Sequence, residues 1–162
     1  MGDSRGFVAS IEASLAGAET RAHRTAVLLV GIDGPRRLQG WLEPAAIETL
    51  GHRAGCRISS CVQEEDGGTV VLLRADAFGV VLPRLRSGLQ ARAAANRILA
   101  TLAGPFGPRI GIAIAPCDGR HALVLVRCAA TALARARQGD RPTYRFYLRA
   151  FATSAASSSP LL

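Results

Sequence analysis

The sequence predicts an α+β domain with a central mixed sheet of about five strands and helices on its faces. One observation is a pair of apolar runs, Thr69–Leu73 and Phe78–Leu82, on either side of a short polar break, a pattern typical of a β-hairpin. The other is that the remaining strand-like runs alternate with segments of helical periodicity. The predicted order is helix, strand, helix, hairpin, helix, strand, helix, strand.

The first half of the chain supplies two helices and one strand. Phe7 to about Ala22 and Pro44 to about Val62 each place apolar residues on one helical face. These inward positions are Phe7, Ile11, Leu15 and Ala18 in the first helix, and Ile47, Leu50, Ala54, Ile58 and Cys61 in the second. Thr25–Ile32 is too short and too β-branched for a helix, so it is predicted as a buried strand. Asp33, which precedes Gly34-Pro35, suits a helix N-cap.

The second half repeats the alternation of helix and strand. The predicted elements are a helix over Gly88–Leu102, a strand over Arg109–Ala115, a helix over His121–Arg137 and a strand over Thr143–Leu148. Ser87 suits the N-cap of the first of these helices, and Gly139 follows the end of the second. Residues 1–149 are therefore expected to form one domain, and the small, polar segment 150–162 a flexible C-terminal tail.

The composition excludes several classes of protein. At 162 residues the chain fits one domain, and no apolar run approaches the roughly 18 residues of a membrane span. The start of the chain does not resemble a signal peptide, so we expect a cytoplasmic protein that does not bind a membrane. The net charge is +8, but all 20 basic residues are arginines scattered between Arg5 and Arg149. We therefore expect no nucleic-acid binding, whereas acidic small molecules such as nucleotides remain compatible with the charge.

The cysteines and histidines do not predict a zinc site. The four cysteines form no C-x-x-C motif, and the three histidines do not lie at zinc-finger spacing from them. Asp76, in the polar break of the hairpin, has two interpretations from the residues alone. It is either a turn residue, because aspartate tolerates turn geometry, or a metal ligand held at a hairpin tip.

Four segments of the chain match the motifs of one protein family in the right order. Leu73–Pro83, LRADAFGVVLP, stands where that family has a pattern like LGGDEFAVLLP. Arg109–Gly119, RIGIAIAPCDG, matches S-I-G-I-A-x-x-P-x-D-G, and Ala129–Arg137, AATALARAR, matches A-D-x-A-L-Y-x-A-K. Val30–Arg36, VGIDGPR, corresponds to a first strand with the pattern L-D-x-D-x-F-K.

Over Phe7–Tyr147 the chain thus resembles the GGDEF domains, the diguanylate cyclases that condense two GTP molecules into cyclic di-GMP. The resemblance implies a fold similar to the nucleotidyl cyclases and the polymerase palm. It also implies a signature turn at Arg74, Ala75, Asp76, Ala77 and Phe78. Asp76 retains the aspartate of this turn, but Arg74 and Ala75 replace the two glycines that let the nucleotide approach the backbone, and Ala77 replaces the glutamate.

Other positions that the resemblance assigns to nucleotide and metal have also changed. The first metal-binding aspartate of the family corresponds to Gly31, and the lysine that meets phosphates corresponds to Arg137. Asp76 and Arg137 are therefore the candidate nucleotide-binding residues, and Asp76 is the vestigial metal ligand. The inhibitory product site, R-x-x-D, corresponds to Glu65 and Gly68, so no such site is expected.

One further segment matches the family in part. Gly51–Cys56 resembles the guanine-contacting G-H-x-x-G-D, but it lies closer to Arg74 than the family pattern allows. The family's spacing to the signature turn places Ala45 and Ala46 at the first two positions of this motif instead. Under either alignment the aspartate is missing.

The resemblance and its departures together predict a catalytically inactive GGDEF-like domain. It would serve as a regulatory or protein-binding module in cyclic di-GMP signalling. The alternative is a weakly active diguanylate cyclase or a GTP-binding sensor that uses Asp76 and Arg137. No cofactor is expected, and Mg²⁺ only together with residual nucleotide binding. The expected partner is another cyclic di-GMP signalling protein or a second copy of this chain, with GTP as the candidate small ligand.

Overall fold

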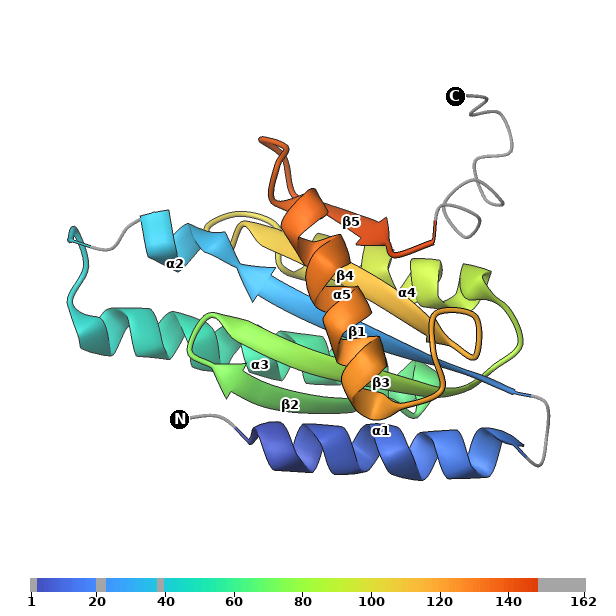
Figure 1. The fold of residues 1–162 in the computed structure, drawn as a ribbon. Helices are drawn as coiled ribbons and strands as arrows, with labels where there is room; N and C mark the ends of the chain where they lie inside the picture. Colours follow the sequence, from blue (N-terminus) through green and yellow to red (C-terminus); the bar gives the residue numbers. More distant parts are fainter. Residues whose placement is uncertain (1–2, 20–22, 38–39, 149–162) are drawn as a thin grey trace.

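A single five-stranded sheet forms the centre of the computed structural model, which describes residues 3–19, 23–37 and 40–148 (Figure 1). The strands are β1 (Arg24–Ile32), β2 (Thr69–Arg74), β3 (Ala77–Leu85), β4 (Pro108–Ala115) and β5 (Thr143–Phe146). The helices are α1 (Ser4–Glu19), α2 (Asp33–Arg37), α3 (Pro44–Asp66), α4 (Gly88–Thr101) and α5 (Ala122–Ala136). The strand order is β2-β3-β1-β4-β5, with β5 parallel to β4 and the other pairs antiparallel. The predicted α+β class and mixed sheet are confirmed.

Helices cover both faces of the sheet, and each face has its own apolar core (Figure 1). Helices α3 and α4 pack on one face, where Leu28 of β1, Ile112 of β4 and Ile58 of α3 belong to the same apolar core. Helices α1 and α5 pack on the other face, where Val27 meets Phe7 of α1. Neighbouring residues of β1 therefore point into different cores. This explains why the central strands are continuously apolar rather than alternating.

Several element boundaries differ from the prediction. Helix α3 continues past its predicted end at about Val62 to Asp66, and it ends there because Gly67 adopts the left-handed conformation at φ 62°. Strand β3 continues beyond the predicted run Phe78–Leu82, through Pro83, as far as Leu85. An irregularity in the β1–β3 register accommodates this proline, because it lies where the pairing shifts. Ser87 caps α4 through a capping box, as predicted. The predicted tail lies outside the described residues.

Asp118 organises the turn between β4 and α5. Its backbone N–H donates to the carbonyl oxygen of Ile114, and its Oδ2 accepts from the Ile114 N–H, both at 2.7 Å. The other carboxylate oxygen, Oδ1, is buried without a hydrogen-bond partner among the described residues. Burial raises the pKa of Asp118 above its usual value of 3.8, and the bond from Ile114 offsets only part of this rise.

We expect Asp118 to lower the free energy of unfolding as the pH rises above the ordinary carboxyl range. The folded state holds the proton more tightly than the unfolded chain. The favourable contribution is therefore complete below the unfolded pKa and is lost as the pH rises through the raised folded pKa. Asp118→Asn cannot ionise and should remove this dependence. Urea unfolding of both proteins between about pH 4 and pH 7 measures the difference, and parallel pH profiles would contradict it.

Candidate functional site

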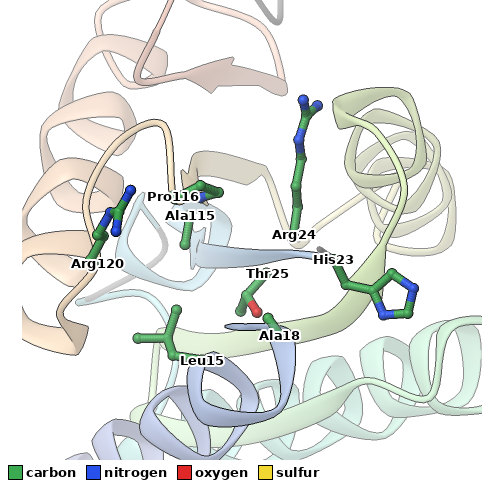
Figure 2. A pocket seen from close by; sticks show the side chains of 8 residues that line it. All are labelled: Leu15, Ala18, His23, Arg24, Thr25, Ala115, Pro116 and Arg120. Carbon is green, nitrogen blue, oxygen red and sulfur yellow. The ribbon is translucent and has the colours of Figure 1, made fainter. Parts of the chain in front are cut away.

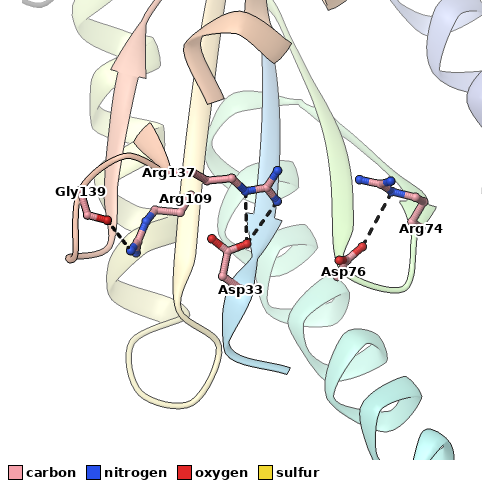
Figure 3. A network of polar contacts seen from close by, with 6 residues as sticks. All are labelled: Asp33, Arg74, Asp76, Arg109, Arg137 and Gly139. Carbon is pink, nitrogen blue, oxygen red and sulfur yellow. Dashed lines mark hydrogen bonds and ion pairs between the residues drawn. The ribbon is translucent and has the colours of Figure 1, made fainter. Parts of the chain in front are cut away.

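Three segments that are distant in sequence meet at one end of the sheet. In the pairing of β1 with β3, Gly31 lies opposite Ala77, and the N–H of Ile32 donates to the carbonyl oxygen of Asp76 at 2.9 Å. The turn between β2 and β3 therefore lies beside the end of β1. Arg137, at the C-terminal end of α5, reaches the same place (Figure 3). The fold thus brings together the residues that sequence reasoning assigned to one site.

The guanidinium of Arg137 lies against Gly31 and pairs with Asp33. A Cβ atom on residue 31 would overlap Nη2 of Arg137, so the group occupies the space beside this glycine. Nε of Arg137 donates to Oδ1 of Asp33 at 3.2 Å (Figure 3). Nη2 lies 3.2 Å from the same oxygen, as an ion-pair contact rather than an aligned hydrogen bond. The Asp33 side chain is 14% exposed, so this pair is largely shielded from water.

The prediction that Asp33 serves as a helix N-cap is wrong. Asp33 is the first residue of α2 rather than the residue before it. Its carboxylate accepts a hydrogen bond from Arg137, the residue after α5 and 104 positions along the chain. The physical reason is that a charged partner gives a partly buried carboxylate a stronger hydrogen bond than a backbone N–H of a five-residue helix.

In the signature turn, Asp76 pairs with Arg74. Nε of Arg74 lies 3.8 Å from Oδ1 of Asp76, and the Arg74 side chain is 66% exposed (Figure 3). Ala75 is exposed, whereas Ala77 and Phe78 are buried, with Phe78 in the core on the α3 side. Of the five turn residues, Phe78 therefore has a packing role.

The residues present do not fit the magnesium ion that the family resemblance implies. Mg²⁺ prefers oxygen ligands and is usually held by one or two carboxylates together with substrate phosphates. The space beside Gly31 contains a guanidinium, and Asp33 is paired with it. Among the residues that the structure describes, no three His, Cys, Asp or Glu side chains are grouped so that they could hold a metal.

Two contacts at this end of the sheet were not predicted from the sequence. Arg109, opposite Gly31 on β4, is 1% exposed, and its Nη2 donates to the carbonyl oxygen of Gly139 at 3.0 Å (Figure 3). It thereby ties the loop after α5 to the sheet. Gly51 of α3 packs so closely against the carbonyl of Ala75 that a Cβ would overlap it. An arginine in an otherwise apolar strand was the available signal for the first; the second has no local signal.

Glu65 and Gly68 are the positions that correspond to the inhibitory product site. The side chain of Glu65 lies outside the described part of the structure. Gly68 is buried, and a Cβ there would overlap the side chain of Val62. The expectation that no product site exists stays a prediction.

Comparison with known proteins gives no match by sequence to a family model or to a curated protein. Comparison of structures does give matches. The GGDEF domain of YfiN, also called TpbB, from Pseudomonas aeruginosa superimposes with a TM-score of 0.83 at 25% identity, over 88% of this chain and 94% of that one. The chain has the fold of a GGDEF domain. The recognition and fold expected from the four motifs are thereby confirmed.

Two other structures with the same fold come from a protein with EAL and GGDEF domains and from a protein bound to its activator. An EAL/GGDEF domain protein from M. capsulatus matches with a TM-score of 0.73 at 26% identity, over 84% of this chain and 92% of that one. The diguanylate cyclase SiaD from Pseudomonas aeruginosa, in complex with its activator SiaC, matches in fold with a TM-score of 0.77 at 13% identity. That match covers 88% of the GGDEF-like domain and 57% of SiaD. Within the described residues, no helix is both long and apolar enough to cross a bilayer.

Proposed function

We propose that this GGDEF-like domain is catalytically silent and acts in cyclic di-GMP signalling by binding a protein partner. The observation that carries the proposal is the guanidinium of Arg137, which lies against Gly31 and pairs with Asp33. A fixed positive charge at this point repels a divalent cation. It also pairs with Asp33, the carboxylate that remains two residues after Gly31, where the family has its first metal-binding aspartate.

The altered turn supports the same conclusion on steric grounds. Arg74 and Ala75 each carry a Cβ where the family has glycines, and the Arg74 side chain extends beside Asp76. Phosphoryl transfer depends on accurate positioning of the phosphates and on a metal that neutralises their charge. In this proposal the nucleotide cannot approach the backbone of the turn and no cation site remains. The domain therefore keeps its fold but does not catalyse phosphoryl transfer.

Binding of a partner protein is the function that the remaining fold can perform. The complex of SiaD with its activator SiaC supports this choice, because it is a GGDEF-fold protein bound to a regulator. The proposed partner is another cyclic di-GMP signalling protein or a second copy of this chain. A cytoplasmic site of action is part of the proposal.

We expect the purified protein to form no cyclic di-GMP from GTP in the presence of Mg²⁺ or Mn²⁺. An active diguanylate cyclase assayed in parallel shows that the conditions support turnover, and product is quantified by chromatography. Turnover by this protein that Asp76→Ala abolishes would contradict the proposal, because such activity would come from the altered site.

Calorimetric titration separates the silent partner-binding domain from a nucleotide sensor. Flat titrations with both GTP and cyclic di-GMP, followed by recovery of a specific protein in a pull-down from the native cell, are expected. Saturable binding of GTP that is lost in both Asp76→Ala and Arg137→Ala would instead identify the sensor. Arg53→Ala, on the exposed surface of α3, serves as a matched arginine control.

A further inference from the structure

A hollow of about 360 Å³ lies at the end of the sheet opposite the signature turn (Figure 2). It is formed where the start of β1 meets the end of β4, since Thr25 pairs with Ala115 in their register. Gly31 pairs with Arg109 at the other end of the same two strands. The hollow is therefore separate from the candidate site described above, and its volume is in the range of small-molecule sites.

The walls of the hollow are largely apolar. Helix α1 contributes Leu15 and Ala18, and the end of β4 contributes Ala115 and Pro116. Thr25 adds a hydroxyl that is fully buried and lies 2.8 Å from the hydroxyl of Ser14. These two hydroxyl groups satisfy each other within the wall. The interior of the hollow is therefore apolar apart from this buried pair.

The charged side chains around the hollow are all basic. Arg24 and Arg120 lie on either side of Ala115 and Pro116, and His23 lies at the edge (Figure 2). Arg120 is exposed and forms no ion pair or hydrogen bond with another residue in the described ranges. No aspartate or glutamate is among the described residues that line it. The electrostatic potential therefore favours an anion.

A neighbouring hollow is less favourable for an anion than the first hollow. This second hollow, between α1 and α5, shares Leu15 and Arg120 with the first but also contains Glu12. The carboxylate of Glu12 counters the attraction of Arg120 for an anion there. An anionic group that contacts Arg120 is thus directed away from Glu12 and toward Thr25, with its apolar part against Leu15 and Pro116.

We propose that this hollow binds a small organic anion, a carboxylate or sulfonate with an apolar body. The anionic group contacts Arg120, and the apolar body lies between α1 and the end of β4. This assignment does not rest on the silent, partner-binding function proposed above. It holds whether or not the signature turn binds a nucleotide.

Fluorescence titration with anilinonaphthalene sulfonate, an aromatic sulfonate, tests the proposal on the full chain. We expect saturable binding that Arg120→Gln weakens roughly three- to tenfold, because it removes a charge-assisted hydrogen bond at an exposed group. Ala18→Phe, which fills the hollow, should abolish it. Arg53→Gln, on α3 across the sheet, should leave the dissociation constant unchanged. Circular dichroism checks that each variant is folded.

Competition identifies the class of ligand. Displacement of the probe by hexanoate and not by inorganic phosphate supports an organic anion with an apolar body. Displacement by phosphate alone would overturn that assignment and leave only a simple anion site. Absence of saturable binding, or equal affinity in the folded Arg120→Gln and wild-type proteins, would overturn the site itself, and the Arg120 variant decides this even where Ala18→Phe does not fold.

Discussion

Replacing Gly111 with valine is expected to destabilise the protein by more than about 4 kcal/mol, a large part of the roughly 5–15 kcal/mol that keeps a typical domain folded. Gly111 lies in the middle of β4, directly beneath α5. A Cβ there would overlap the carbonyl oxygen of Ala129 and the backbone nitrogen of Leu133. Both are main-chain atoms of a packed helix, so neither can turn aside as a side chain would. Valine has a high strand propensity, and the expected loss therefore runs against what propensity alone predicts.

The measurement is chemical unfolding followed by circular dichroism, with Gly17→Ala as the matched control. No atom outside its own helix backbone lies within 4 Å of a Cβ at residue 17, which is exposed near the end of α1. That variant should gain about 0.5–1 kcal/mol, because alanine is the better helix former. A folded Gly111→Val protein with a near-normal midpoint would mean that α5 does not pack on β4 as described.

Removing the Arg137 side chain is expected to lower the free energy of unfolding by about 2–3 kcal/mol. Arg137→Ala leaves the Asp33 carboxylate, 14% exposed, without the partner that it has in the folded protein. Breaking a fully buried pair in this way typically costs about 3–5 kcal/mol. The lower figure allows for the 26% exposure of the Arg137 side chain, which lets water screen the pair.

Arg74→Ala is the matched control for Arg137→Ala, since it breaks the other ion pair at this end of the sheet. That pair is longer, at 3.8 Å, and its arginine is 66% exposed. Exposed pairs contribute about 0–1 kcal/mol, so the change in stability should be small. Urea unfolding of the two variants under identical conditions gives the comparison. Equal losses would show that the Arg137–Asp33 pair contributes no more to stability than the exposed Arg74–Asp76 pair.

Most of the fold could be predicted from the sequence because its elements are locally determined. The strand over Thr25–Ile32 and the hairpin at Thr69–Leu82 were recognisable from apolar runs and turn residues, and the structure confirms them. Ser87 was recognisable as a cap because its partner, Gln90, lies one turn away. The end of the second hairpin strand at Leu82 was predicted wrongly, because the irregular pairing with β1 that lets β3 continue to Leu85 cannot be seen in β3 alone.

The candidate site was predictable in its positions and not in its contacts. The family motifs placed Gly31, Asp76 and Arg137 together, and the structure brings them to one end of the sheet. Sequence reasoning assigned Arg137 to a phosphate and Asp33 to its own helix. Their pairing joins residues 104 positions apart, and no spacing rule covers such a contact. A guanidinium fits there only because residue 31 has no side chain, which becomes evident once β1 and α5 are packed.

The contact between Gly51 and Ala75 joins the signature turn to α3. The helix lies against the backbone of the turn and leaves no room for a side chain at residue 51. On the silent function proposed above, glycines at residues 74 and 75 alone would leave this contact in place, and the guanidinium of Arg137 would still lie against Gly31. An engineered cyclase built on this scaffold would therefore need changes in the turn and around residue 31 together.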